Sequence, residues 1–287
     1  MARLAGHAII RMSVCLLTLR FIWVEPMQLN RPLLLNRILQ PKQGLRVIAT
    51  TVVCSMLLFG CGEIKSATEY LISGNEAFQR NDYKQAEIEY KKAIHLEPNS
   101  STALNNLGVV LNELGKYDDA VAILTRAVKI DPKNVIARYT LAQALTKSGK
   151  YAEAIVEAKQ AVELGNSDLG GHRALAQAAL LKAKKDKDSE DLKLAIAEYH
   201  VILQVDPDDD QAHHNLGDAL AMQNDKDGAI TEQKKAVELN EDNLAAHKSL
   251  ANLLHEKGDN EGAQKQLDII IKKNPSDTEA RTLRGSL

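Results

Sequence analysis

The chain has 287 residues, of which 45% are hydrophobic but only 4% aromatic, and its formal net charge is −2. The charge is unevenly spread: residues 1–61 carry seven Arg or Lys and one acid, whereas the rest carries 29 bases and 37 acids. An acidic body argues against a nucleic-acid binder, which concentrates positive charge on one face. No run of about 20 apolar residues occurs, so the sequence predicts no transmembrane helix.

The first segment is typical of an export signal and not of a folded domain. Lys42 and Arg46 precede a stretch of twelve mostly apolar residues without a charge, 47–58. That length matches the apolar core of a secretory signal and is too short to cross a bilayer. The residues before Met27 fit no signal design, so translation starts either at Met1 or at Met27.

The last of the three cysteines, Cys61, follows this apolar stretch. With the three residues before it, in the order Leu-Phe-Gly-Cys, it resembles the bacterial lipobox, in which an aliphatic, a variable and a small residue precede the cysteine. The resemblance implies removal of residues 1–60 and attachment of lipid to the Cys61 thiol. The alternative is a cysteine that merely lies in an apolar signal core, as Cys54 does.

The same resemblance predicts where the mature protein is held. Residues 61–66 would form the lipidated cysteine and a short tether, so that the protein faces the periplasm from a membrane. Gly62 is not the Asp that retains lipoproteins in the inner membrane of enteric bacteria. The outer membrane is therefore favoured over the inner one.

The remainder of the chain is periodic, with a repeat of 34 residues counted from Ala67. The fourth repeat has 41 residues, because a mostly charged insertion of seven, 184–190, interrupts its middle. The six repeats are 67–100, 101–134, 135–168, 169–209, 210–243 and 244–277, and residues 278–287 follow as a capping tail. Position 20 of the repeat is always Ala, position 8 is always Gly or Ala, and all four prolines after Cys61 stand at position 32.

Each recurring residue has a mechanical reason. Small side chains at positions 8 and 20 let two antiparallel helices approach, while Leu at position 7 and apolar residues at 24 and 28 form the buried face. Glycine at position 15 (Gly115, Gly149 and Gly258) ends the first helix of a repeat. Proline at position 32 stops the second helix before the next repeat begins. The pattern predicts an all-α fold of helix–turn–helix repeats.

This length and pattern resemble the tetratricopeptide repeat over residues 67–277. The resemblance implies an α-solenoid, a right-handed superhelix whose core forms by stacking one repeat on the next. The family's usual Trp at position 4 is replaced, in the order of the repeats, by Tyr70, Leu104, Arg138, His172, His213 and His247. The last residues place Arg281 and Arg284 where a further repeat would be apolar, which is typical of a solvent-facing cap.

Nothing in the sequence indicates catalysis. No phosphate-binding glycine loop, GxSxG or HExxH motif occurs, so we expect no enzyme, no cofactor and no small-molecule substrate. The adjacent His213 and His214 could suggest a metal site, because imidazole is a common metal ligand. Neighbouring helical residues point about 100° apart, however, so we expect these histidines to pack and not to bind a metal.

The family resemblance implies a concave groove lined by the first helix of each repeat. Carboxamides gather at these positions, and an amide can pair with both the N–H and the C=O of an extended peptide. The predicted groove residues are Asn75, Asn105, Asn106, Asn112, Tyr139, Gln143, Gln177, His214, Asn215, Asp218, Lys248 and Asn252. The alternative is that these amides are ordinary residues of a helix surface.

One specialised groove is excluded. Chaperone-binding members of the family clamp a terminal carboxylate, and Asn75 and Asn106 match that clamp. Leu71, Ile136 and Thr140, however, stand where the clamp needs cations, so its main attraction is missing.

The sequence therefore predicts a membrane-anchored scaffold or assembly factor that binds an extended peptide or a partner protein. An alternative is a pilotin-like factor in type IV pilus or secretion-system assembly, whose Asn-Asn-Tyr-Gly stretch is partly matched by residues 105–108. A third class, a cell-wall hydrolase or its regulator, has no supporting group of residues.

Overall fold

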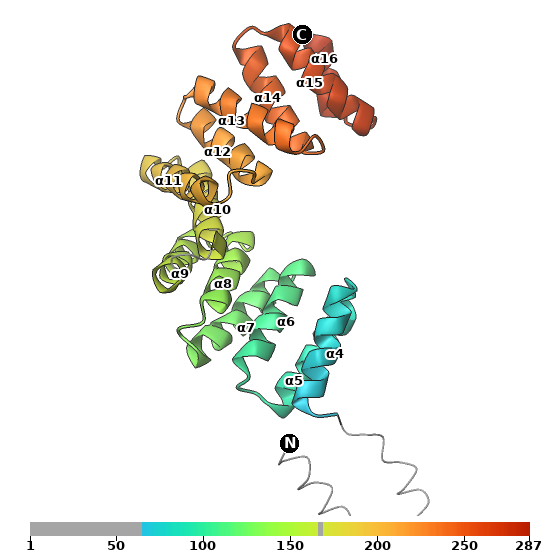
Figure 1. The fold of residues 1–287 in the computed structure, drawn as a ribbon, viewed down its shortest axis with the longest axis vertical. Coiled ribbons are helices and arrows are strands. Elements are labelled where there is room, and N and C mark those ends of the chain that lie inside the picture. The colour runs from blue at the N-terminus through green and yellow to red at the C-terminus, as the bar shows by residue number, and fades with distance from the viewer. Residues whose placement is uncertain (1–64, 166–168) are drawn as a thin grey trace, which may run out of the picture. The chain divides into compact units, whose positions relative to one another are not determined.

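The computed structural model describes residues 65–165 and 169–287. The proposed signal, Cys61 and most of its tether lie outside the described residues. Lys65–Leu287 form one compact unit, and every regular element described in it is an α-helix. The expected all-α solenoid of helical repeats is therefore confirmed (Figure 1). None of the described helices is long and apolar enough to span a membrane.

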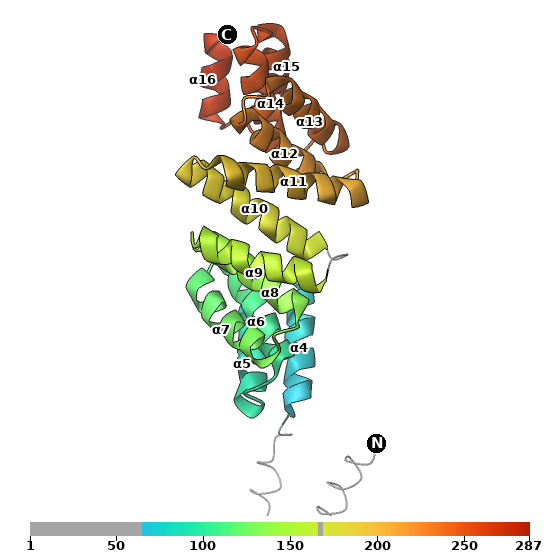
Figure 2. The ribbon, with the colours of Figure 1, turned by 90° about the vertical axis from the view of Figure 1, so that its left-hand side faces the viewer.

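Two helices form each repeat, and successive pairs are stacked in chain order (Figures 1 and 2). The first helices are α4 (Ala67–Gln79), α6 (Ser101–Glu113), α8 (Val135–Lys147), α10 (Leu169–Asp186), α12 (Asp210–Met222) and α14 (Leu244–Glu256). The second helices are α5 (Tyr83–Leu96), α7 (Tyr117–Ile130), α9 (Tyr151–Leu164), α11 (Ser189–Val205), α13 (Lys226–Leu239) and α15 (Asn260–Lys273). A last helix, α16 (Thr278–Ser286), follows. Each first helix begins at the residue where its sequence repeat begins.

Local sequence explains where these helices start and stop. Most first helices are capped by a Ser, Asn or Asp whose side chain accepts a hydrogen bond from the backbone three residues on, as Ser66, Asn134 and Asp209 do. The glycines at position 15 have positive φ angles of 71°, 79° and 83°. Asn81 and Asn224 take the same left-handed conformation in repeats 1 and 5, because Asn tolerates it better than most residues.

The core is built from small residues at the crossing of each helix pair. All six alanines at position 20 are fully buried. Position 8 does not face them: a Cβ added at Gly74 would lie 2.5 Å from the ring of Tyr90, which is at position 24. The glycine therefore makes room for a large partner at position 24, and not for the alanine at position 20.

Position 28 is less buried than the sequence pattern predicts. Its residues, such as Ile94 and Val128, are only half-buried. Position 27 is buried in every repeat instead, by Ala93, Ala127, Ala161, Ile202, Ala236 and Ile270. The reason is helical geometry: position 27 lies three residues after position 24 and seven after position 20, on the same face of the second helix.

The insertion of repeat 4 lengthens both helices and does not form a long loop. Helix α10 has 18 residues and α11 has 17, against 13 and 14 in the other repeats. Lys187, with φ of 56°, makes the turn between them. Lys185 lies over the ring of Tyr151, with its Nζ 5.7 Å from the ring centroid, so the insertion contacts repeat 3.

Helix α16 covers the end of the stack. Ala280 is buried and Leu283 packs on the core cluster that contains Leu267. Arg281 and Arg284 are exposed, and Arg284 pairs with Asp268 of α15. Basic residues at these two positions keep the outer face of α16 in water.

Candidate peptide-binding groove

The first helices of repeats 4, 5 and 6 line a pocket of about 410 Å³, which we call the Tyr199 pocket. Four of the predicted groove residues, from three different helices, line it together: Gln177, Asn215, Asp218 and Asn252. Its other lining residues are Leu180, Leu181, Lys184, Tyr199, Ala221, Met222, Ser249, Leu253 and Glu256. The pocket thus combines amides and a carboxylate with an aliphatic wall. Sequence reasoning found the amides and Asp218 but not the wall.

Tyr199 of α11 lies beneath this pocket. The side chain is 3% exposed, and its hydroxyl has no hydrogen-bond partner among the described residues. Burial raises the pKa of the hydroxyl, and the Asp218 carboxylate adds to the rise. The Asn215 amide lies near the hydroxyl and opposes this rise in pKa, but no hydrogen bond joins the amide to the hydroxyl. The hydroxyl therefore stays protonated and keeps a hydrogen to donate.

Asp218 is held by neutral donors. Its Oδ1 atom accepts hydrogen bonds from Gln233 Nε2 at 2.8 Å and from Ser249 Oγ at 2.9 Å. Gln233 stands at position 24 of repeat 5, where the other repeats have Tyr, Leu or Ala, and it is fully buried. A polar group at that depth needs partners, and Asp218 supplies one of them.

His214 is placed differently from the sequence prediction. It is only 7% exposed, and its Nδ1 lies 2.9 Å from Gln233 Oε1. The imidazole turns into the core because the buried carboxamide of Gln233 satisfies it there. His214 therefore supports the floor of the groove and does not face a partner.

Repeats 1 and 2 form a second pocket on their first helices, of about 340 Å³, which we call the Tyr90 pocket. It is lined by Asn75, Phe78, Gln79, Tyr90, Asn106 and Val109. Here the polar groups bond to one another: Tyr90 donates its hydroxyl to Asn75 Oδ1 at 2.8 Å, and Asn106 Nδ2 donates to the same oxygen at 3.1 Å. Burial raises the pKa of Tyr90, and Asn106 opposes that rise.

The remaining predicted residues lie outside both pockets. Asn105 donates to Asn106 Oδ1 at 3.5 Å, while the Oδ1 atoms of Asn105 and Asn112 are buried without a partner among the described residues. Tyr139 and Gln143 are half-buried on α8. Lys248 forms an ion pair with Glu279 of α16. The structure therefore does not bring the twelve predicted residues into one site.

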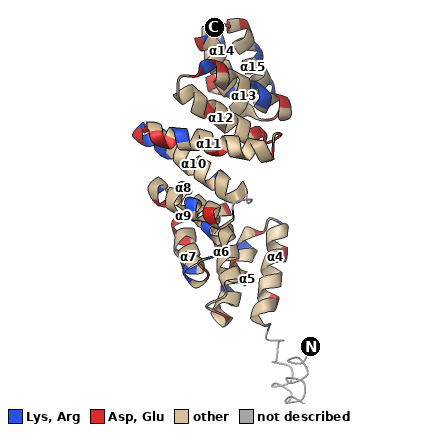
Figure 3. Ribbon diagram, turned by 60° about the vertical axis from the view of Figure 1, so that its left-hand side comes forward, with Lys and Arg blue, Asp and Glu red and all other residues tan. Residues whose placement is uncertain are grey.

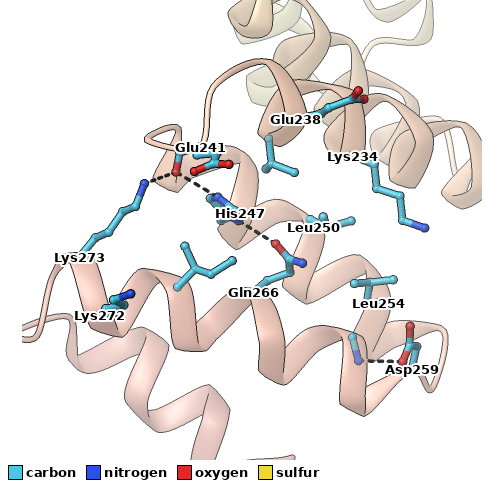
Figure 4. Close-up of a pocket in the computed structure, with 13 residues that line it drawn as sticks. Lys234, Glu238, Glu241, His247, Leu250, Leu254, Asp259, Gln266, Lys272 and Lys273 are labelled. Carbon is cyan, nitrogen blue, oxygen red and sulfur yellow. Dashed lines mark hydrogen bonds between the residues drawn. The ribbon is translucent and has the colours of Figure 1, made fainter.

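A third and larger pocket, of about 650 Å³, lies on the other side of α14, between α13 and α15 (Figure 4). His247 spans it: Nδ1 lies 2.7 Å from Gln266 Oε1, and Nε2 lies 3.3 Å from the carbonyl oxygen of Glu241. That carbonyl also accepts from Lys273. His247, Gln266, the Glu241 carbonyl and Lys273 are thus joined to one another, while Lys234, Glu238 and Lys272 line the pocket without bonding to this group.

The histidines at position 4 have a structural role. The position-4 side chain pairs with the position-23 side chain of the same repeat in four cases: Arg138 with Glu157, His172 with Glu198, His213 with Glu232 and His247 with Gln266. These contacts join the two helices of one repeat. Within the described part of the chain, no group of three His, Cys, Asp or Glu side chains is placed to hold a metal ion.

Charge does not single out one face of the described helices. Acidic and basic residues are interspersed along them, and they alternate at the turn between α10 and α11 (Figure 3). Stacked helical repeats of this kind are typical of scaffolds for protein interaction, because the stack presents an extended binding surface.

Comparison with known sequences identifies the family. One sequence profile of the tetratricopeptide repeat matches residues 111–178 and 227–287, and a second matches 73–135 and 180–243. The chain therefore belongs to the tetratricopeptide repeat family. A search of curated proteins returned no match.

Solved structures have the same fold. TTC0263, a thermophilic tetratricopeptide repeat protein of Thermus thermophilus, is 27% identical, with 65% of this chain and 98% of that one covered and a TM-score of 0.54. PilW, a widely conserved type IV pilus biogenesis factor, is 15% identical over 76% of this chain and 97% of its own, with a TM-score of 0.68. YrrB, a tetratricopeptide repeat protein with an unusual peptide-binding site, is 20% identical. The match covers 68% of this chain and 97% of YrrB, with a TM-score of 0.52.

Proposed function

We propose that this protein is a membrane-anchored lipoprotein on the periplasmic side, which binds an extended segment of a partner protein in its concave groove. The observation that carries the binding role is the Tyr199 pocket. Gln177, Asn215 and Asn252 come from three successive first helices and line one groove. Amides spaced along a groove can pair with successive peptide groups of an extended chain.

The chemistry of the groove favours a peptide over other partners. Each free carboxamide offers two donors and an acceptor, which matches the alternating N–H and C=O groups of a peptide main chain. The aliphatic residues Leu181 and Met222 beside the amides give a partner side chain an apolar surface to cover. Neither feature suits a nucleic acid, whose phosphates need a positively charged face.

Selection of peptides tests this role directly. The full chain, immobilised through a C-terminal tag, is exposed to a random linear peptide library displayed on phage, and enriched peptides are synthesised. Their affinity is measured by fluorescence anisotropy for wild type, Asn215→Ala and Asn252→Ala. Each substitution should weaken binding by about 1 kcal/mol, the typical net worth of a hydrogen bond.

Arg126→Ala on α7 is the matched control, because this exposed residue lines neither the Tyr199 nor the Tyr90 pocket and should leave the affinity unchanged. Failure to enrich any peptide, or equal affinity for wild type and both Asn variants, would contradict a peptide-binding groove.

The anchor rests on the sequence around Cys61, outside the described residues. Cys61→Ser should abolish incorporation of a labelled fatty acid and leave the precursor unprocessed, because this thiol is the attachment point. Cys54→Ser is the control and should label like wild type. Equal labelling of wild type and Cys61→Ser would contradict lipidation, and fractionation of the labelled protein tests the preference for the outer membrane.

The second candidate is an assembly factor for a type IV pilus or a secretion system. Two observations favour it: the fold of PilW covers 76% of this chain, and residues 105–108 partly match the stretch expected of such factors. Deletion of the gene should then abolish surface pili, visible by electron microscopy, and the wild-type chain should restore them. Normal piliation in the deletion strain would rule this role out.

A further inference from the structure

The Tyr199 pocket contains a hydrogen-bond donor that none of the described residues uses. We propose that this pocket binds one neutral, extended peptide segment, with an aliphatic side chain between α10, α12 and α14 and a main-chain carbonyl that accepts the hydrogen bond of Tyr199. The inference rests on the proposed peptide-binding function and names the part of the peptide that is recognised.

The hydroxyl of Tyr199 is the first argument. A buried polar group without a partner is rare, because it has lost its bonds to water and gained none in return. The Tyr199 hydroxyl is such a group, since its oxygen is inaccessible and bonds to no residue in the described part of the chain. Because it remains protonated beside Asp218, it suits a neutral acceptor such as a carbonyl.

Access to the hydroxyl depends on Asn215. The amide of Asn215 lies beside the hydroxyl, and its Oδ1 accepts a hydrogen bond from Gln211 at 3.1 Å in the free protein. Both residues are on α12, and Gln211 is exposed, so this bond exchanges readily with water. When the Asn215 side chain turns toward a peptide N–H, the neighbouring carbonyl of the peptide can reach Tyr199.

The aliphatic wall is the second argument. Leu180 and Leu181 of α10, Met222 of α12 and Leu253 of α14 surround the pocket. Met222 is 42% exposed, which is high for a large apolar side chain. An aliphatic side chain placed here would cover Met222, and the flexible thioether adapts to its shape. The wall extends along α10 to Lys184, because the insertion lengthens that helix.

The charges around the pocket balance, which favours an uncharged occupant. Its titratable side chains other than Tyr199 are Lys184, Asp218 and Glu256. Glu256 is compensated by Lys226 at 2.8 Å. That leaves one cation, Lys184, and one anion, Asp218, among the described lining residues, so neither a phosphate nor a free carboxylate finds a net positive site.

The test uses two variants at the same repeat position. Tyr199→Phe removes only the unpaired hydroxyl, whereas Tyr90→Phe removes a hydroxyl already bonded to Asn75. The full chain and both variants are titrated with a peptide enriched from the linear library and, separately, with N-acetyl-leucine methylamide. Binding of the blocked leucine is followed by the methyl NMR signal of Met222.

We expect Tyr199→Phe to weaken both probes by about two- to tenfold, the effect of one lost hydrogen bond, and Tyr90→Phe to leave both affinities unchanged. Replacing the aliphatic residue of the peptide by Ala should weaken binding further. N-acetyl-leucine, which carries a carboxylate, should bind no more tightly than the neutral methylamide.

Three results would overturn the proposal: equal affinity for wild type and Tyr199→Phe, tighter binding of the charged probe, or a blocked leucine that leaves the Met222 signal unmoved. If enriched peptides nevertheless bind and depend on Asn215 and Asn252, the proposed function stands and only the assignment of the pocket fails. If no peptide binds at all, the proposed function fails with it.

Discussion

The Tyr90 and Tyr199 pockets share two residue types at the same repeat positions, but their polar groups are bonded differently. Each has a tyrosine at position 24 and an asparagine at position 6 of the following repeat, Asn106 or Asn215. In the first pocket the hydroxyl donates to Asn75, which also accepts from Asn106. In the second the hydroxyl finds no acceptor among the residues that the structure describes.

Two neighbouring residues explain the difference. Position 8 is Gly74 in repeat 1, where a Cβ would lie 2.5 Å from the Tyr90 ring, but Ala176 in repeat 4, which carries that Cβ. Position 9 is Asn75 in repeat 1 and the longer Gln177 in repeat 4. The ring in repeat 1 therefore lies close to α4, and its hydroxyl bonds to Asn75.

The comparison shows that the same pair, Tyr at position 24 and Asn at position 6 of the next repeat, can stabilise the fold in one place and stay available for binding in another. A fully bonded set of polar groups stabilises the fold and has little left to offer a ligand. A buried donor without a partner costs stability, and binding can recover that cost. Unsatisfied groups of this kind are expected where a protein functions.

The largest effect is expected at Gly74. Gly74→Ala should lower the free energy of unfolding by about 1–3 kcal/mol, because the new Cβ overlaps the Tyr90 ring. Repeat 1 is at the end of the stack, so the loss should appear as faster hydrogen exchange in α4 and α5. Gly285→Ala is the control, since no described atom lies within 4 Å of its added Cβ, and it should cost nothing. Unchanged exchange in Gly74→Ala would refute the close packing of Tyr90.

The two tyrosines should respond differently to removal of their hydroxyls. Tyr90→Phe should lower the free energy of unfolding by about 1 kcal/mol, because it breaks the bond to Asn75. Tyr199→Phe should leave it unchanged or raise it, since an unpaired buried hydroxyl is removed. Urea unfolding followed by circular dichroism measures both. Equal losses would mean that the Tyr199 hydroxyl has a partner in solution, and the contrast between the pockets would disappear.

Deletion of residues 184–190 tests whether the fold around the Tyr199 pocket needs the longer helices of repeat 4 for its stability. The change should shift the free energy of unfolding by no more than about 1 kcal/mol, because all seven residues are exposed at the helix ends and none contributes a buried side chain to the core. The contact of Lys185 with Tyr151 is exposed and contributes little. Lys185→Ala alone serves as the control for that contact. Collapse of the fold in urea unfolding would place the insertion in the core and contradict the repeat register.

The smallest effect is expected for the paired asparagines. Asn106→Ala combined with Asn215→Ala should change the free energy of unfolding by no more than about 0.5 kcal/mol, because both side chains are only partly buried and the hydrogen bonds that they lose, to Asn75 and Gln211, are exposed to water. The same urea titration measures this, with either single variant as the control. A loss well above that size would assign these amides to the fold and not to binding.

Much of the fold could be read from local patterns. The positive φ angles of Gly115, Gly149 and Gly258 follow from glycine at a fixed repeat position. The start of most first helices follows from a capping residue and the repeat length. These features depend on a few neighbouring residues, so spacing along the chain is enough to predict them.

The groove was harder to predict, because it depends on contacts between helices. Sequence reasoning gave His214 to the groove, yet Gln233, nineteen residues later, holds it in the core. It chose the amides around Tyr199 and overlooked Tyr199 itself. The available signal was the recurrence of tyrosine at position 24 of repeats 1 and 4.

The sequence by itself determined the class of fold, the number of stacked repeats and the polar character of the first helices, because a period of 34 residues is present in the chain before it folds. Only the tertiary structure decided which polar groups are satisfied. Tyr90 and Tyr199 have the same residue type and the same repeat position, yet only the Tyr90 hydroxyl is hydrogen-bonded within the described residues. The first helix of the repeat carries Gly74 and Asn75 beside Tyr90. The corresponding residues in repeat 4 are Ala176 and Gln177. A hydrogen bond requires two atoms within about 3 Å, and that distance is set only when the helices pack.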